Sequence, residues 1–336
     1  GGTYEEAKQK GTARRPPWTK DAEVANPMSR YPRYKRLRAS WSGGFSQVGC
    51  LVTADDGSWG FGTTGYGEMS MHLINDHIGP LLEGENAMAT EKLWDMMQRI
   101  TSPYSPSGLA SYAISAVDLA LWDLIGKACG QPVYKILGGY RDKILAYGST
   151  MCGDDMEGGL ATPEDYANFA EWMLGRGYKA IKLHGWMTPM PGAPDVKLDY
   201  RACAAVREAV GPDIPLMLDP HHFYSRSEVL WLARKLEELD FLWMEEPMEE
   251  ASMSSFKWLT GNTGLNILGP ETMTGKHWTR GEWVKHDACD MVRTGVWDVG
   301  GISPAMSSVT GLYEQHIASG EIAPGEAVSL VGRSGS

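Results

Sequence analysis

The sequence predicts a parallel (β/α) barrel that follows an N-terminal α+β unit. After residue 145, short apolar runs alternate regularly with helical patterns of about 12 residues, which is typical of a parallel sheet covered by helices. Before residue 142, a hairpin pattern and several helical patterns follow one another without this alternation. The chain has 336 residues, 43% of them hydrophobic, and so is long enough for one large domain with a smaller one attached.

The N-terminal part predicts a long loop, a hairpin and helices. Residues 1–45 are rich in Gly, Pro, Lys and Arg and show little periodicity, which indicates a loop with at most short helical turns. The β-rich runs Val48–Thr53 and Trp59–Thr63 flank the turn signal Asp56-Gly57, so we expect a hairpin. A helical pattern over residues 69–84 should break at Pro80.

The strongest helical pattern of this half covers residues 107–130. Its apolar residues share one face at the helical period, and Gly130 followed by Pro132 can end the helix. No run of about 18 apolar residues occurs anywhere in the chain, so we expect no membrane span. The first residues lack the basic start and apolar core of a signal peptide.

The second half predicts six strand–helix units. The predicted strands are Ile144–Ser149, Ala180–Trp186, Leu216–Asp219, Phe241–Glu245, Asn266–Gly269 and Met291–Thr294. The first helix should begin at Thr162-Pro163, where Thr162 can cap and Pro163 suits the first helical position. The other predicted helices are Leu198–Val210, Ser227–Leu239, Ser252–Leu259, Lys276–His286 and Pro304–Gln315.

A closed barrel of this type needs eight strands, so the predicted barrel is incomplete. After Gln315 about twenty residues remain, and they are small, polar and loop-like. We therefore expect an N-terminal unit over residues 1–142, a barrel part over 143–316 and an atypical C-terminal tail over 317–336. A fragment, a frameshifted tail and an unusual C-terminus would each explain the missing units.

Composition narrows the class of protein. The formal net charge of −11 argues against nucleic acid as the main partner. The five cysteines are widely spread and form no CxxC pair, so neither a zinc site nor a disulfide framework is indicated, and a reducing cytoplasm is the natural location.

Three acidic residues end three successive predicted strands. Asp219, Glu245 and Glu271 are 26 residues apart, one strand–helix repeat each time, so their side chains should meet at the C-terminal mouth of the barrel. A single strand-end acid is usually structural. Three carboxylates placed together would repel one another, and a divalent cation removes that repulsion. Because all the ligand atoms are oxygens, the sequence predicts a Mg²⁺ site.

Candidate acids and bases lie beside these carboxylates. Lys182 and His184 alternate along a strand and so share a face, where either could transfer a proton near neutral pH. We expect a lowered pKa for a desolvated Lys182 beside a cation; the alternative is a buried ion pair with Asp219. His221 follows Asp219 by two residues and is a further candidate, whereas His222 fits better in a polar turn.

These parts together suggest a reaction. A cation held by three carboxylates can bind a substrate carboxylate, and a neighbouring base can remove the proton α to it. Protonation of a leaving β-hydroxyl would then give dehydration, whereas the same site without that step would give racemisation or epimerisation. Glu246, next to Glu245, and Tyr66 and Glu68 in "TGYGEM" are candidate substrate contacts, although the latter two could simply form a hairpin-end loop.

At this point the sequence resembles the enolase superfamily, and within it the mandelate-racemase-like acid-sugar dehydratases. The resemblance extends from about Asn26 to Met306 and rests on "SAVDLALWDLIGKACGQPVYKILGG" (115–139), "LWMEEP" and "DVGGIS". It implies an α+β domain that caps a barrel, Mg²⁺ bound by Asp219, Glu245 and Glu271, a homo-oligomer, and the second-strand Lys-x-Lys motif in the form Lys182-x-His184. "NPMSRYPRY" is similar to rhamnonate dehydratases, and "DPHH" is similar to galactonate and mannonate dehydratases, which assigns a catalytic role to His221.

Three departures from the family pattern bear on the activity. Gly295 stands where the resemblance implies an aspartate that would partner a seventh-strand histidine. No seventh- or eighth-strand motif follows "GGISPAMSSV", and the first strand of the capping domain is missing, so the chain is expected to be truncated at both ends. The alternatives to a dehydratase are a racemase, epimerase or cycloisomerase of the same superfamily, and an inactive truncated homologue.

Overall fold

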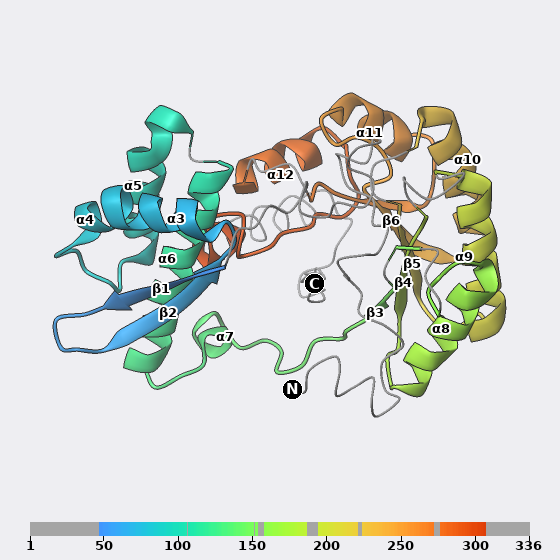
Figure 1. The fold of residues 1–336 in the computed structure, drawn as a ribbon. Coiled ribbons are helices and arrows are strands. Elements are labelled where there is room, and N and C mark those ends of the chain that lie inside the picture. Colours follow the sequence, from blue (N-terminus) through green and yellow to red (C-terminus); the bar gives the residue numbers. More distant parts are fainter. Residues whose placement is uncertain are drawn as a thin grey trace.

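The structure, a computed structural model, describes residues 47–105, 107–150, 152–153, 158–186, 194–220, 224–271 and 276–306. They form two lobes (Figure 1). The N-terminal lobe contains a hairpin and a group of helices, and the C-terminal lobe contains a parallel sheet with helices on its outer side. The segment that ends at residue 306 returns to the N-terminal lobe.

The N-terminal lobe begins with the predicted hairpin. Strands β1 (Val48–Thr53) and β2 (Trp59–Thr64) pair antiparallel, with Leu51 opposite Phe61. The helical elements that follow are α3 (Gly67–Leu73), the π-helical turn η3 (Ile74–Ile78), α4 (Gly79–Leu82), α5 (Thr90–Thr101), the 3₁₀ turn η4 (Ser102–Tyr104), α6 (Leu109–Ala128) and α7 (Val133–Ile136).

The predicted helix break at Pro80 is wrong. Helical geometry continues from α3 through η3 into α4, and Pro80 is the second residue of α4. Pro80 directly follows the π-helical turn η3, where the regular α-helical hydrogen bonds are already interrupted, so the missing proline N–H is tolerated in a continuing helix.

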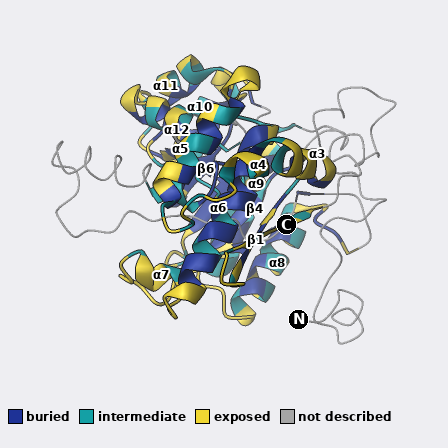
Figure 2. Ribbon diagram, turned by 90° about the vertical axis from the view of Figure 1, so that its left-hand side faces the viewer, coloured by how far each residue is buried: buried dark blue, intermediate teal, exposed yellow. Residues whose placement is uncertain are grey.

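Helix α6 is the core of the N-terminal lobe. Figure 2 shows this helix largely in the dark blue of buried residues, and β2 lies directly on it. A Cβ on Gly60 would lie 1.9 Å from the Ala120 carbonyl oxygen, so only glycine permits this approach. Among the described helices, only α6 is long and apolar enough to cross a membrane. However, 78% of its 18-residue apolar stretch is buried inside the protein, as in a core helix.

The C-terminal lobe is built on a five-stranded parallel sheet. Its strands are β3 (Gly148–Ser149), β4 (Ile181–His184), β5 (Leu216–Asp219), β6 (Phe241–Glu245) and β7 (Asn266–Leu268). They are paired in sequence order, as successive strand–helix units require. In the described part of the chain the sheet does not close into a complete barrel.

Helices lie between the strands and cover the outer face of the sheet (Figure 1). They are α8 (Pro163–Gly175), α9 (Val196–Val210), α10 (Arg226–Glu238), α11 (Met253–Thr260) and α12 (Lys276–Lys285). α8 begins as predicted, because Thr162 accepts a hydrogen bond from the Asp165 N–H and the Asp165 side chain accepts one from the Thr162 N–H. Their inner faces and the strands form one hydrophobic core that includes Tyr166, Leu218 and Trp283.

The first and last predicted strands are shorter than expected. Only Gly148–Ser149 of the predicted run Ile144–Ser149 is a strand, and Ile144 and Leu145 are exposed. The predicted strand Met291–Thr294 is reduced to a single parallel bridge between Met291 and Leu268. Residues 302–306 are helical, and the rest of the helix predicted to Gln315 lies outside the described residues. Both strands are shorter than their apolar runs because, in the described chain, each pairs with a neighbouring strand on one side only.

A buried aspartate on α6 joins the two lobes. Asp118 accepts hydrogen bonds from the Ser303 N–H at 3.1 Å and the Ser303 hydroxyl at 2.6 Å, and so caps the helical residues 302–306 from another element. A Cβ on Gly301 would lie 2.1 Å from Asp118 Oδ2. The Gly300 N–H donates to Ser115 Oγ. The glycines of "DVGGIS" therefore allow the chain to approach α6 closely.

We expect Asp118 to make stability depend on pH. Burial raises the pKa of Asp118 to about 6, although the Ser303 hydrogen bonds oppose the shift. The folded state therefore binds the proton more tightly than the unfolded state. The resulting stabilisation is complete below about pH 4 and is lost as the pH rises through 6. Relative to Asp118→Asn, the wild-type free energy of unfolding should fall by about 3 kcal/mol between pH 4 and pH 7.

Denaturant unfolding of both proteins over this pH range measures the difference. Asp55→Asn, in the exposed hairpin turn, is the matched control and should follow the wild-type curve. Parallel curves for the wild type and Asp118→Asn would contradict the prediction.

Candidate metal centre and active site

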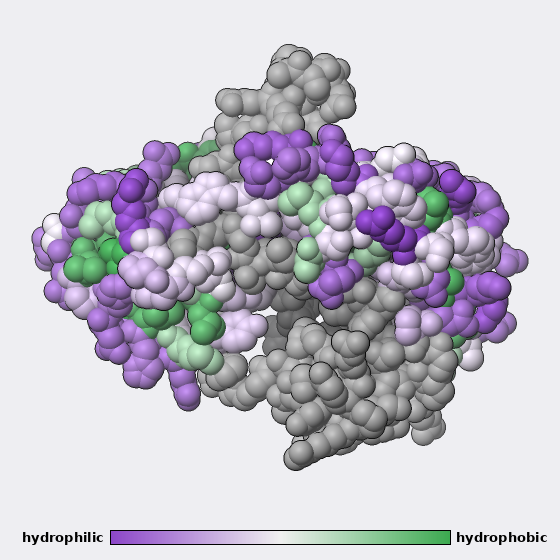
Figure 3. Space-filling view, turned by 90° about the horizontal axis from the view of Figure 1, so that it is seen from above, coloured by the Kyte–Doolittle hydropathy of each residue, from purple (hydrophilic) through white to green (hydrophobic). Residues whose placement is uncertain are grey.

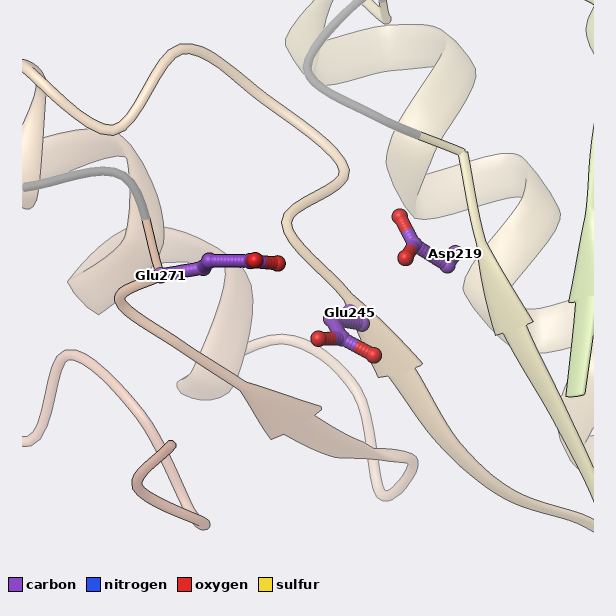
Figure 4. Close-up of side chains that lie close together, drawn as sticks. All are labelled: Asp219, Glu245 and Glu271. Atoms are coloured by element: carbon purple, nitrogen blue, oxygen red, sulfur yellow. The ribbon is translucent and has the colours of Figure 1, made fainter. Parts of the chain in front are cut away.

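Three carboxylates converge at the C-terminal ends of neighbouring strands. Asp219 ends β5, Glu245 ends β6, and Glu271 follows β7. Figure 4 shows the three side chains turned toward a common centre. One oxygen from each residue lies within 4.8 Å of the others, with Asp219 and Glu245 buried and Glu271 half-buried. The structure thus brings together the three residues that the sequence predicted as metal ligands.

Two cations balance these carboxylates. Lys182 Nζ lies 2.6 Å from Glu245 Oε2 and 3.0 Å from Asp219 Oδ2. Arg293 Nη1 lies 3.3 Å from Glu245 Oε1 and also pairs with Glu271. Three negative charges thus face two positive charges, which leaves one net negative charge at the strand ends.

The donor set fits a hard divalent cation. All three residues offer carboxylate oxygens, the ligands that Mg²⁺ prefers in proteins. Glu245 Oε1 is buried, lies 3.3 Å from Arg293 Nη1 and accepts no hydrogen bond within the described residues, so a bound cation would satisfy it. A divalent cation would change the net charge of this cluster from −1 to +1, which suits a carboxylate substrate. Asp219, Glu245 and Glu271 would hold the ion.

Lys182 is an ion-paired cation in this structure. Burial by itself would lower the pKa of Lys182, but the charges of Asp219 and Glu245 outweigh it and raise the pKa. The geometry shows the alternative, a buried ion pair with Asp219. The lowered pKa was expected for Lys182 beside a bound cation and stays a prediction. The pairing with Asp219 was named from the sequence, and Glu245 is the second carboxylate partner.

His184 lies beside Lys182 and points at the same carboxylate. Its Nε2 is 3.0 Å from Asp219 Oδ2, and its Nδ1 is 2.7 Å from the Thr150 carbonyl oxygen. The His184 N–H also donates to Thr150 Oγ1. One ring nitrogen thus faces a carboxylate oxygen and the other faces a backbone carbonyl oxygen. The ring is therefore fixed at the edge of the carboxylate cluster.

The remaining predicted site residues are Glu246, which directly follows Glu245, Tyr66 and Glu68 in the N-terminal lobe, and His221. Glu246 is fully buried, and burial together with the charge of Glu250 raises its pKa well above the usual range. Tyr66 and Glu68 lie at the start of α3, where the Tyr66 ring packs edge-on against Tyr112. Their roles as substrate contacts stay predictions. His221 and His222 lie outside the described residues.

Arg293 has no role in the predicted site, although it occurs near the end of the predicted sixth strand. The parallel bridge at Met291 brings Arg293 to the same mouth as the three acids. Arg280, which is also buried, donates from Nε to the Arg293 carbonyl oxygen at 2.6 Å. The position of Arg293 near the end of the predicted sixth strand could have indicated that it reaches the mouth. Nothing in the sequence indicates a contact for Arg280.

Gly295 is closely surrounded. A Cβ at this position would lie 2.8 Å from Asp298 Oδ1 and 3.0 Å from Trp297 Nε1. The space that a side chain would need is therefore occupied. A larger residue at this position would require Asp298 and Trp297 to shift.

The fold and the site together define a barrel-type α/β protein with a carboxylate cluster that can hold a metal ion at the C-terminal ends of its strands. Residues 46–138 match the N-terminal domain model of the mandelate racemase/muconate lactonizing enzyme family, and residues 165–317 match the enolase C-terminal domain-like model. The chain belongs to this family of the enolase superfamily.

Two curated relatives are sugar-acid dehydratases. L-Rhamnonate dehydratase of Saccharopolyspora erythraea is 34% identical over 232 residues, which are 68% of this chain and 55% of that protein. Arabinonate dehydratase of Saccharolobus solfataricus is 31% identical over 266 residues, 77% of this chain and 67% of the relative. The chain therefore spans about half the length of the first relative and two thirds of the second.

Solved structures show the same fold. D-Glucarate dehydratase from Agrobacterium tumefaciens, complexed with magnesium, has a TM-score of 0.74 and 52% identity and matches over 79% of this chain and 68% of its own. A racemase from Streptomyces coelicolor with bound magnesium has a TM-score of 0.71 and 26% identity, over 81% of this chain and 74% of its own. The fold thus occurs in enzymes with different reactions.

Proposed function

We propose that the protein is a Mg²⁺-dependent acid-sugar dehydratase, a hydro-lyase that converts an aldonate or a related sugar acid to a 2-keto-3-deoxy acid. The observation that carries this proposal is the convergence of Asp219, Glu245 and Glu271 beside Lys182 and His184. The dehydratases among the similar proteins support it, and so do the solved structures of this fold that contain magnesium.

The residues would divide the work as follows. A bound Mg²⁺ would supply the positive charge that makes the proton α to the substrate carboxylate acidic and stabilises the enediolate. Lys182 and His184 lie on one face of β4 beside the carboxylates, so each is placed to remove that proton when its side chain is neutral. Arg293 adds a fixed positive charge at the same mouth. His221 is the further candidate for protonating the leaving β-hydroxyl.

The proposal also covers the binding partner, the cellular location and the domain organisation of the protein. A net charge of −11 and a described upper surface that is mostly hydrophilic, with hydrophobic residues in small patches (Figure 3), support a small-molecule acid sugar as partner rather than nucleic acid or membrane. We also propose a cytoplasmic location, a homo-oligomer, and a division into a capping domain (1–142), a barrel domain (143–316) and a tail (317–336).

A product screen tests the proposed reaction. The purified protein is incubated with a library of aldonates and aldarates in the presence of Mg²⁺, and 2-keto acids are measured as their semicarbazones. We expect a 2-keto-3-deoxy product from at least one acid sugar and loss of that product when EDTA removes the metal. Turnover that EDTA does not affect would contradict the proposal.

A racemase or epimerase is the second candidate, and the magnesium-bound racemase of the same fold supports it. The same incubations in D₂O separate the two. Incorporation of deuterium at the α-carbon without loss of water would identify a racemase or epimerase, whereas a deoxy product identifies the dehydratase.

A further inference from the structure

Asp199 is a further buried carboxylate, which lies on a helix and not at the end of a strand. Asp199 occupies the first turn of α9 and is 2% exposed. Its Oδ1 accepts a hydrogen bond from the Trp186 N–H at 3.0 Å, and the Tyr224 hydroxyl donates to its Oδ2. A buried carboxylate with these two partners connects segments that are far apart in the sequence.

The hydrogen bond from the Trp186 N–H to Asp199 holds the segment after β4. Trp186 is two residues beyond His184, and a Cβ on the intervening Gly185 would lie 2.6 Å from Asp199 Oδ1. The Tyr166 hydroxyl donates to the His184 carbonyl oxygen, and its ring packs edge-on against Trp186 at 4.7 Å between centroids. Hydrogen bonds from Tyr166 and to Asp199 therefore hold the backbone on both sides of Gly185.

The hydrogen bond from the Tyr224 hydroxyl to Asp199 connects it to the segments after β5 and β6. Tyr224 lies five residues beyond Asp219, and its N–H donates to the Pro247 carbonyl oxygen at 3.2 Å. Pro247 lies two residues beyond Glu245. Through Tyr224, Asp199 thus contacts the segments that follow two of the three proposed metal ligands.

We propose that Asp199 is a positioning residue of the active site, whose carboxylate ties together the segments that follow β4, β5 and β6 and so sets where His184 stands relative to Asp219 and Glu245. Burial raises the pKa of Asp199 to about 6, and the hydrogen bonds from Tyr224 and Trp186 oppose this shift. Burying a carboxylate costs free energy, and a protein retains such a group where its hydrogen bonds hold other parts in place, which is consistent with a positioning role.

The experiment compares Asp199→Ala with Asp195→Ala. Asp195 caps the same helix by accepting hydrogen bonds from the Lys197 and Leu198 N–H groups, and no described hydrogen bond joins it to either loop. We expect Asp199→Ala to speed amide hydrogen exchange in residues 181–186 and 216–226 and to weaken Mn²⁺ binding about 10-fold. Asp195→Ala should leave both close to the wild type.

A kinetic arm rests on the proposed function. Where the wild type dehydrates an acid sugar, Asp199→Ala should lower kcat about 10- to 100-fold with little change in KM, and Asp199→Asn, which keeps one oxygen acceptor, should recover part of the loss. A wild type without this activity would contradict the proposed function only, because the exchange and Mn²⁺ measurements still decide on Asp199.

Equal behaviour of Asp199→Ala and Asp195→Ala in exchange and Mn²⁺ binding would overturn the proposal. Should Asp199→Ala fail to fold, Tyr224→Phe carries the test, because it deletes only the hydroxyl that donates to Asp199. It should speed exchange in residues 216–226 and weaken Mn²⁺ binding in the same direction, and wild-type values for both would equally overturn the proposal.

Discussion

Replacing Glu245 with glutamine should abolish metal-dependent turnover and leave the protein folded. Glu245 is the middle one of the three carboxylates and contacts both Lys182 and Arg293. A neutral amide is a poor ligand for Mg²⁺, and the metal contributes several kcal/mol to stabilising the developing charge, so we expect kcat to fall by at least about 10³-fold. Titration with Mn²⁺, followed by calorimetry, should show loss of tight binding.

Folding should survive this substitution for an electrostatic reason. The cluster of three acids and two cations has a net charge of −1, and Glu245→Gln makes it neutral. Lys182 keeps Asp219 as a partner, and Arg293 keeps Glu271. Thermal unfolding monitored by circular dichroism checks this, with Glu249→Gln, exposed in the loop after β6, as the control. Wild-type metal binding and activity in Glu245→Gln would remove the metal assignment.

The convergence of the three carboxylates could be predicted from the sequence because it depends on local register. Each lies at the end of a strand, and parallel strands in successive units bring their ends to one edge, so the equal 26-residue spacing was sufficient. The pairing of Lys182 and His184 on one face followed from strand alternation in the same way. The hairpin and the start of α8 rest on turn and capping residues, which act within a few positions.

The features that the sequence did not show depend on contacts between distant segments. Lys182 meets Asp219 and Glu245, which are 37 and 63 residues away, so its charge state depends on both at once. Asp118 contacts Ser303 across 185 residues, and nothing near it in the chain indicates a cap. Arg293 reaches the mouth through a single bridge at Met291, too short to appear as a strand pattern.

Lys182→Met is the second change from which we expect a large effect, because Lys182 has two roles that respond differently to metal. Without Mg²⁺, the variant leaves three buried or half-buried carboxylates with Arg293 as their cation, so the free energy of unfolding should fall by about 3 to 5 kcal/mol. Saturating Mg²⁺ supplies the missing positive charge, and we expect it to recover most of this loss.

Turnover then separates charge balance from proton transfer. If Lys182 transfers a proton, Lys182→Met stays inactive under the saturating Mg²⁺ that restores its stability, and this is the result we expect. Lys179→Met, exposed just before β4, is the matched control and should change neither stability nor turnover. Full activity in Mg²⁺-saturated Lys182→Met would assign Lys182 to charge balance alone and leave His184, 3.0 Å from Asp219, as the base on β4.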